Sequence, residues 1–265
     1  MSPIPDPPAY FDLTGKIAMV VGAEFPAGAA IARAYAEAGA DVALCALTAD
    51  EAVMRSRKVK REIEAMGRRA TEYVMDVTLG RNVQVTTRQI AKEMGGLDIV
   101  ASAPDLFLAK PIEKVTDMEL ARVMQMNFAS QFFIVRTAAA EFRRDHRPGR
   151  ILLVTSILGE RSMIDTVAYA SAHGAVYNLV RSAAHELAAE GITLNAISLG
   201  WMDYMDDRLD RESEDGSRAG RFSMLRRPGR AEEIGPAAVW LASVTGASFV
   251  TGQIIPIDGG LLQHQ

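Results

Sequence analysis

Short apolar runs alternate with amphipathic stretches along almost the whole chain. Lys16 to Val21 is a short apolar run closed by Gly22, and Gly28 to Gly39 carries apolar residues at helical spacing. The same order of strand, turn and helix then recurs. Further strands are predicted at Asp41 to Leu47, Ala70 to Val77, Leu97 to Ala103, Arg150 to Ser156, Ile192 to Ser198 and Phe249 to Ile257, and helices at Asp50 to Met66, Asn82 to Met94, Thr116 to Arg144, Thr166 to Ala189 and Glu232 to Leu241. This alternation predicts an α/β fold: a single doubly wound, Rossmann-type parallel sheet in a three-layer α/β/α arrangement, with ligands at the carboxyl ends of the strands.

Two segments stand apart from this alternation. Residues 1–10 form a proline-rich arm, so the Rossmann-type domain is expected over residues 11–265. Within that domain, residues 201–223 mix acidic side chains with arginines and show no strong core pattern. An insertion of this length between a strand and the next helix is predicted to be a lid rather than a second domain.

Composition narrows the class of protein. With 265 residues, 49% hydrophobic and 23% charged, the chain can bury a full core. With 29 basic and 33 acidic residues, the protein is not expected to have a basic surface that binds nucleic acid or a membrane. The single cysteine, Cys45, cannot form an internal disulfide, and no long apolar run is present, which together predict a cytoplasmic protein. The histidines show no metal spacing with one another or with Cys45, so no metal site is expected.

Three positions form a candidate catalytic motif: Ser156, Tyr169 thirteen residues later, and position 173, four residues after the tyrosine. Inside this α/β alternation it resembles the short-chain dehydrogenase/reductase family, over about residues 11–261. The supporting matches are Gly22 and Gly28 after the first strand, Asp76-Val77 after the third, Asn127 in the long helix, Asn195-Ala196 in the sixth strand, and the closing runs Thr251-Gly252-Gln253 and Asp258-Gly259-Gly260.

The resemblance assigns catalytic roles by position. It implies that Tyr169 exchanges the proton of the alcohol or ketone, that Ser156 holds the substrate oxygen, and that Asn127 holds a relay water. The family's lysine, which binds the nicotinamide ribose and lowers the pKa of the tyrosine, is His173 here. Four-residue spacing keeps Tyr169 and His173 on one helix face, but an imidazole with a pKa of about 6.5 is mostly neutral at pH 7 and shorter than lysine. The alternative interpretation is a helix residue hydrogen-bonded to a neighbour.

The resemblance also implies NAD or NADP, held at Gly22, Gly28, Asp76, Val77, Ala103 and Gly200. The family's first turn, Thr-Gly-x-x-x-Gly-x-Gly, is altered here. Pro26 replaces a glycine that lets the backbone approach the pyrophosphate, so that a ring fills this space and an N–H donor is lost. Glu24 adds a carboxylate beside the helix N-terminus, and two hypotheses remain open: that it caps the helix in place of a pyrophosphate, or that it is an exposed loop residue.

Further departures fall around the same nucleotide. Ala101-Ser102-Ala103-Pro104 replaces Asn-Asn-Ala-Gly, Leu199-Gly200 replaces Pro-Gly, Tyr204 aligns with the threonine of the carboxamide site, and Ala46 and Leu47 replace the residues that select NAD or NADP. Each lost hydrogen bond costs about 1 kcal/mol, so four or five of them with a steric block reduce affinity on the order of a thousandfold. Met163, Met202 and Met205 flank the expected substrate cleft and either line it or belong to the core.

Two functions follow from these observations. The first is a catalytically impaired subunit with weakened or lost NAD(P) binding, which assembles as a homo- or hetero-oligomer, a tetramer by family, with an active dehydrogenase. The alternative is a divergent but active NAD(P)-dependent dehydrogenase or ketoreductase that uses Tyr169 and Ser156 on a small hydroxyl or carbonyl substrate. Alanine-rich faces at Ala138-Ala139-Ala140 and Ala183-Ala184 are predicted to suit close contact between subunits.

Overall fold

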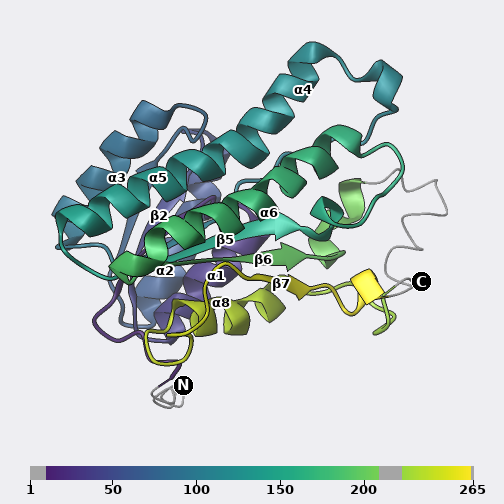
Figure 1. Ribbon diagram of the computed structural model, residues 1–265. Helices are drawn as coiled ribbons and strands as arrows, with labels where there is room; N and C mark the ends of the chain where they lie inside the picture. Colours follow the sequence, from purple (N-terminus) through teal and green to yellow (C-terminus); the bar gives the residue numbers. More distant parts are fainter. Residues whose placement is uncertain (1–9, 209–222, 264–265) are drawn as a thin grey trace.

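One parallel sheet forms the centre of the molecule. The computed structural model describes residues 10–208 and 223–263, and within them seven parallel strands lie in the order β3-β2-β1-β4-β5-β6-β7 (Figure 1). The strands are β1 (Ile17–Val21), β2 (Asp41–Ala46), β3 (Ala70–Val74), β4 (Ile99–Ser102), β5 (Arg150–Ser156), β6 (Thr193–Leu199) and β7 (Ile254–Ile257). The predicted Rossmann-type fold is confirmed. Residues 1–9 of the proline-rich arm and residues 209–222 of the predicted lid lie outside the described residues.

Helices cover both faces of the sheet. They are α1 (Pro26–Glu37), α2 (Glu51–Ala65), α3 (Gly80–Met94), α4 (Asp117–Met124), α5 (Ser130–Arg144), α6 (Val167–Leu187) and α8 (Gly235–Ala242). The short helical turns are η1 (Ile112–Lys114), η2 (Gln125–Ala129), η3 (Ile157–Gly159), η4 (Ala188–Glu190), η5 (Asp203–Arg208), η6 (Ala231–Ile234) and η7 (Leu261–Gln263). Most predicted boundaries agree to within a few residues, because apolar periodicity is strong in each element.

Two predicted elements differ from the structure. The long helix expected from Thr116 to Arg144 is interrupted by the π-helical turn η2, which separates α4 from α5. The last strand covers only Ile254–Ile257, whereas residues 249–253 lead into it as a loop that contains Gly252 at a φ of 72°. A positive φ favours glycine and ends regular strand geometry, which is why the strand starts later than its apolar residues suggest.

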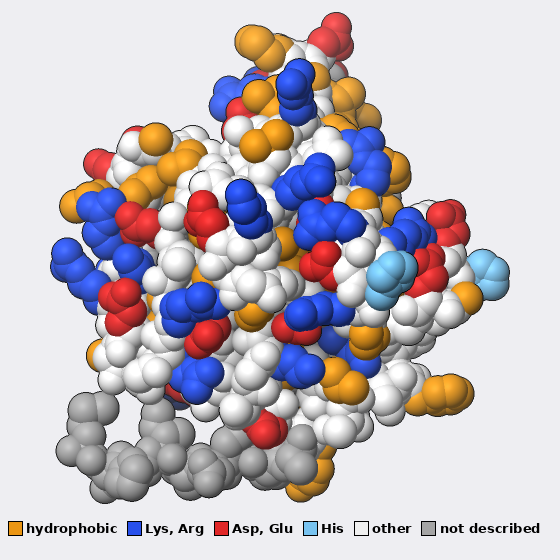
Figure 2. Space-filling model, turned by 90° about the vertical axis from the view of Figure 1, so that its left-hand side faces the viewer, with side chains coloured by type: hydrophobic (Ala, Val, Ile, Leu, Met, Phe, Trp, Pro, Cys, Tyr) orange, Lys and Arg blue, Asp and Glu red, His pale blue; other side chains and the backbone are white. Residues whose placement is uncertain are grey.

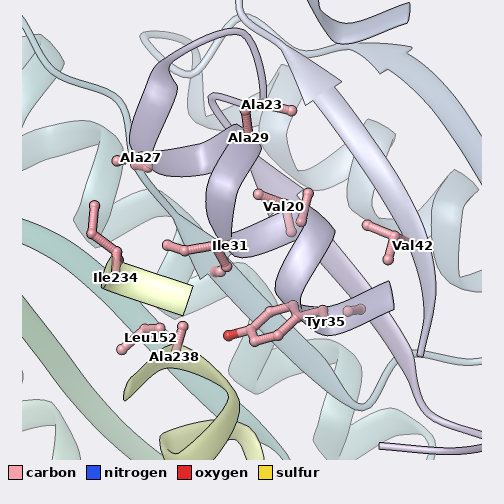
Figure 3. Packing of buried hydrophobic residues seen from close by; sticks show 14 of the residues in the cluster. Val20, Ala23, Ala27, Ala29, Ile31, Tyr35, Val42, Leu152, Ile234 and Ala238 are labelled. Carbon is pink, nitrogen blue, oxygen red and sulfur yellow. The ribbon is translucent and has the colours of Figure 1, made fainter. Parts of the chain in front are cut away.

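Alternating residues of the strands build two separate core layers. Ala18 and Val20 of β1 pack in the layer of α1, α2 and α8, whereas Met19 and Val21 pack in the layer of α3, α5 and α6. Figure 3 shows Tyr35 of α1 within the first layer. Both layers are apolar, so the sheet is buried on both sides, as expected for parallel strands.

Three of the five alanines in the two alanine-rich segments point inward. Ala138, Ala139 and Ala184 are buried against the sheet in the layer of α3, α5 and α6, so the prediction that these faces make close contact between subunits is wrong for them. Small side chains there let α5 and α6 approach the strands closely. The outer face of α5 instead carries Phe132 and Arg136, with the guanidinium 5.8 Å from the centre of the phenyl ring.

The outer surface carries both signs of charge. On the face that Figure 2 shows, Lys and Arg side chains are interspersed with Asp and Glu and do not gather into a patch of one sign. In the described part of the chain, no helix is both long and apolar enough to cross a membrane.

Candidate functional site

A pocket opens at the carboxyl ends of β4, β5 and β6, beside the N-terminus of α1, where the order of the strands reverses between β1 and β4. It contains about 430 Å³ of space, its open mouth included. The lining residues are Phe25, Pro26, Ala27, Ala103, Pro104, Asp105, Val154, Thr155, Ser156, Tyr169, His173, Leu199, Tyr204 and Met205. The structure therefore brings the predicted Ser156, Tyr169 and His173 together.

Helix α6 sets the relative position of the tyrosine and the histidine. Tyr169 and His173 are one turn apart, and each is only 3% exposed. Their ring centroids are 4.3 Å apart, so both side chains lie on one face of the helix, as the spacing predicts. One turn further along α6, the Tyr177 hydroxyl donates to the Ser156 carbonyl and contacts the Ser198 hydroxyl at 2.8 Å, which ties the helix to the ends of β5 and β6.

Tyr169 and His173 both face the carboxylate of Asp105, a residue that was not predicted from the sequence. The Tyr169 hydroxyl donates to Asp105 Oδ1 over 2.9 Å, and His173 Nε2 lies 3.6 Å from the same oxygen. Asp105 follows Pro104 just after β4, at the carboxyl end of a central strand. That location was the available signal, since polar residues at such strand ends form the sites of this fold class.

The other nitrogen of His173 contacts the neighbouring strand. His173 Nδ1 lies 2.9 Å from Thr155 Oγ1, which fixes the orientation of the ring. Among the residues that the structure describes, Nε2 has no hydrogen-bond partner. The interpretation of His173 as a helix residue bonded to a neighbour agrees with the Thr155 contact, although the ring also lines the pocket.

Ser156 and Asn127 occupy different environments. Ser156 Oγ accepts the N–H of Leu158 over 3.2 Å and lines the pocket. Asn127 is fully buried in the π-helical turn η2 and does not line it. Its amide accepts from Leu106 N over 2.8 Å and donates to Leu106 O over 2.9 Å, which anchors the loop that carries Asp105.

The predicted glycines of the nucleotide site are required by contacts within the protein. A Cβ on Gly28 would lie 2.2 Å from the Gly22 carbonyl oxygen, and one on Gly200 would lie 2.5 Å from Asp258 Cα. Gly22 has a φ of 78°, and a Cβ there would lie 3.0 Å from the carbonyl carbon of Ala103. The turn after β1 therefore packs directly against the loop after β4.

Asp76 and Val77 also have partners of their own. The Asp76 carboxylate accepts from Thr78 N over 2.9 Å and from Thr78 Oγ1 over 2.6 Å, while Val77 is buried in the core. Neither residue lines the pocket. Of the three methionines expected near the cleft, only Met205 lines the pocket, and Met202 is fully buried.

Glu24 turns into the protein, but away from the helix end that it was expected to cap. Helix α1 begins at Pro26, and its N-cap residue Phe25 provides no side-chain hydrogen bond. Glu24 Oε1 instead accepts the N–H of Leu47 over 2.8 Å, just beyond the end of β2. Burial raises the pKa of this carboxyl, and the Leu47 hydrogen bond offsets part of that rise. The capping hypothesis and the exposed-loop alternative are both wrong.

Several residues here differ from the dinucleotide site that the resemblance implies. Pro26 removes an N–H donor at the first position of α1, and the Pro26 ring and Pro104 both line the pocket. His173, which stands at the position that the resemblance assigns to the nicotinamide ribose, and Tyr169 both face the Asp105 carboxylate. In addition, no cluster of three or more metal-ligating side chains occurs within residues 10–208 and 223–263.

Comparison with known proteins gives consistent matches along the chain. The family model described as enoyl-(acyl carrier protein) reductase matches residues 24–262. The 2-dehydro-3-deoxy-D-gluconate 5-dehydrogenase of Pseudoalteromonas atlantica is 31% identical over 252 residues, which cover 94% of this chain and 97% of that protein. The L-2,3-butanediol dehydrogenase of Corynebacterium glutamicum is 28% identical over 259 residues, with 94% and 99% covered.

Solved structures give the same result. A short-chain type dehydrogenase/reductase from Mycobacterium marinum superposes with a TM-score of 0.86 at 30% identity, covering 95% of this chain and 97% of that one. A blue fluorescent protein from a metagenomic library, crystallised in complex with NADPH, superposes with a TM-score of 0.85 at 30% identity, covering 94% and 99%.

Proposed function

From the premise that this chain belongs to the short-chain dehydrogenase/reductase family, we propose that it is a catalytically impaired member which assembles with an active dehydrogenase. The chemical setting is the interconversion of a hydroxyl and a carbonyl group on a small molecule, as in the family. The impairment has two parts, the electrostatics around Tyr169 and the geometry of the nucleotide site.

The hydrogen bond from Tyr169 to Asp105 carries this proposal. Tyrosine acts as a base only as phenolate, and a nearby fixed cation favours that form. Here the phenol donates to a carboxylate over 2.9 Å, and the neighbouring ring is a histidine buried beside the same carboxylate. A carboxylate acceptor stabilises the neutral phenol and opposes a second negative charge next to it. A neutral phenol cannot take a proton from an alcohol, and the hydroxyl hydrogen of Tyr169 is bonded to Asp105 rather than directed to a ketone oxygen.

The nucleotide side supports the same function. A pyrophosphate at a helix N-terminus depends on free backbone N–H groups and close backbone approach. Pro26 removes one of these N–H groups and its ring limits the approach of the backbone. Glu24 Oε1 accepts the Leu47 N–H and is not available to a ligand. Each lost hydrogen bond costs about 1 kcal/mol, and these losses support weak binding of NAD or NADP, for which we expect millimolar affinity or weaker.

The outer surface of α4 and α5 supports assembly. Met118 is 72% exposed, Leu120 is 43% exposed and Phe132 is 42% exposed, and Ile112 just before α4 is 66% exposed. Figure 1 shows α4 extending beyond the sheet. Exposed apolar side chains gathered on neighbouring elements are typical of a surface covered by a second subunit. The partner is expected to be a motif-complete dehydrogenase of the same fold, in a tetramer.

A titration of the purified protein with NADH and with NADPH tests the nucleotide part. Nucleotide fluorescence and melting temperature should change little below millimolar concentrations, whereas a motif-complete dehydrogenase measured in parallel should saturate. Submillimolar binding of either nucleotide would contradict the proposal and favour the alternative, an active enzyme that uses Tyr169 and Ser156. Purification from the native host, with identification of the subunits by mass spectrometry, tests the partner; a homo-oligomer without a second dehydrogenase contradicts that part.

A further inference from the structure

The pocket holds one base that the proposed function leaves unused. His173 is buried and lines the pocket, and no described residue hydrogen-bonds to its Nε2 atom. Buried nitrogen atoms normally have a hydrogen-bond partner, so one without a partner on a pocket wall points to a ligand. Since nothing in the proposed function employs this nitrogen, its chemistry can be considered independently.

Contacts on both sides of the ring suit His173 to accept a proton. When Nδ1–H donates to Thr155 Oγ1 at 2.9 Å, Nε2 carries the free lone pair of the ring. When Nε2 takes a proton, it lies 3.6 Å from Asp105 Oδ1, which is close enough for an ion pair. A base oriented by a second side chain and facing a carboxylate has the arrangement of a general base.

The pocket also contains a donor for an oxygen atom. Because Ser156 Oγ uses a lone pair to accept Leu158 N–H, its hydroxyl hydrogen remains available to donate into the pocket. Phe25, Leu199 and Met205 give the remaining walls an apolar character. Such walls exclude water and strengthen the interaction of a hydroxyl donor with a developing negative charge.

We propose that this pocket catalyses cofactor-free proton transfer at the carbon next to the carbonyl of a small α-hydroxy ketone or aldehyde, with His173 as the base and Ser156 as the donor to the carbonyl oxygen. The C–H bond breaks and an N–H bond forms at Nε2. The C–H electron pair becomes the C=C bond of an enolate, and the carbonyl pair moves onto the oxygen. The proton on Nε2 is replaced by one from solvent, and this proton is delivered to the same carbon as the enolate returns to the ketone, so the carbon-bound hydrogen exchanges with solvent and no carbon is oxidised or reduced.

This activity goes beyond the proposed function, and it needs no nucleotide. Thr155 and Asp105 act through His173 and are positioning residues. Their contribution is separable from that of the base, because Thr155→Ser keeps the hydroxyl at Nδ1 whereas Thr155→Val removes it in a side chain of the same shape.

Hydroxyacetone in deuterated buffer at neutral pH is the probe, with loss of its methylene proton signal followed by NMR in the absence of NAD and NADP. Wild-type protein should accelerate exchange over protein-free buffer. His173→Gln should remove at least a hundredfold of that acceleration, as expected for the loss of a general base. Thr155→Val should reduce the rate about five- to tenfold, and Thr155→Ser should retain it.

Two outcomes overturn the proposal: wild-type protein no faster than protein-free buffer, or His173→Gln as fast as wild type. Melting temperatures of all variants identify any loss caused by misfolding, and Thr155→Ser keeps the test informative if the valine variant unfolds. Nucleotide binding is measured separately, so the proposed function and this activity can fail independently.

Discussion

Replacing His173 by lysine restores the residue that the family has at this position, and we expect that it restores neither nucleotide binding nor turnover. A lysine here would place its ammonium next to Asp105, whose Oδ1 is 3.6 Å from the present Nε2. At that separation, with the effective dielectric constant of about 20 that suits protein sites, the ion pair gains about 4 to 5 kcal/mol. A hydrogen bond from the same ammonium to a ribose hydroxyl is worth about 1.5 to 3 kcal/mol. The ammonium therefore remains on Asp105.

The consequence can be measured without any substrate. His173→Lys and Asp105→Asn, alone and together, form a double-mutant cycle in which the unfolding free energy reports the new ion pair. We expect a coupling energy of at least about 1 kcal/mol. His173→Met, similar in length and uncharged, is the matched control and should show no such coupling with Asp105→Asn. Urea unfolding curves give these free energies.

Activity provides the second readout. His173→Lys, assayed with NADH or NADPH and a small ketone, should show no reduction above wild type, because Pro26 still lies at the pyrophosphate position and the ammonium is paired. A gain of ketone reduction from this single change, or a coupling energy of zero in the cycle, would contradict this prediction. The first result would show that the altered turn matters less than we argue, and the second that Asp105 does not bind the ammonium.

Two further predictions concern stability. Gly28→Ala places a Cβ 2.2 Å from the Gly22 carbonyl oxygen, a backbone atom that cannot rotate away, so it should destabilise the protein by about 1 to 3 kcal/mol and lower the melting temperature by several degrees. The matched control is Gly174→Ala in α6, where the nearest atom to the new Cβ is the Gly159 carbonyl oxygen at 3.4 Å, so the melting temperature should hold or rise; an equal fall in both variants contradicts this prediction. For Glu24, burial raises the pKa of the carboxyl above 4.5, so the folded protein binds the carboxyl proton more tightly than the unfolded chain does. The stability that this proton contributes is therefore lost as pH rises from about 4.5 through the pKa of Glu24 in the folded protein. The unfolding free energy of wild type minus that of Glu24→Gln should therefore decrease between pH 4 and pH 8, and a constant difference in urea unfolding would disprove the assignment.

The fold was predictable because its determinants are local and repeated. Each strand is a short apolar run and each helix an amphipathic stretch, so the parallel sheet and its two covered faces follow from periodicity alone. The π-helical turn η2 was not predictable, since Gln125 to Ala129 keep the apolar spacing of the surrounding helix. What marks that turn is the burial of Asn127 and its two hydrogen bonds to Leu106, which depend on a loop distant in sequence.

The site was predicted in part. Ser156, Tyr169 and His173 meet in one pocket because two of them share a helix face and the third ends an adjacent strand. Asp105 was missed because its importance comes from a hydrogen bond across 64 positions of the chain. The prediction that Glu24 caps α1 was also wrong. Its carboxylate accepts the Leu47 N–H instead, and this contact depends on how close the ends of β1 and β2 lie to each other.

The contact between the turn after β1 and the loop after β4 has a consequence for any redesign of the pocket. Gly22 lies so close to Ala103 that a Cβ would be 3.0 Å from the Ala103 carbonyl carbon and 3.1 Å from the Pro104 nitrogen. The turn and the loop are thus in direct contact, and substitutions at such neighbouring sites are not additive. Residues of the turn and of the loop therefore have to be exchanged together, because either segment changed alone would pack against a neighbour that fits the present sequence.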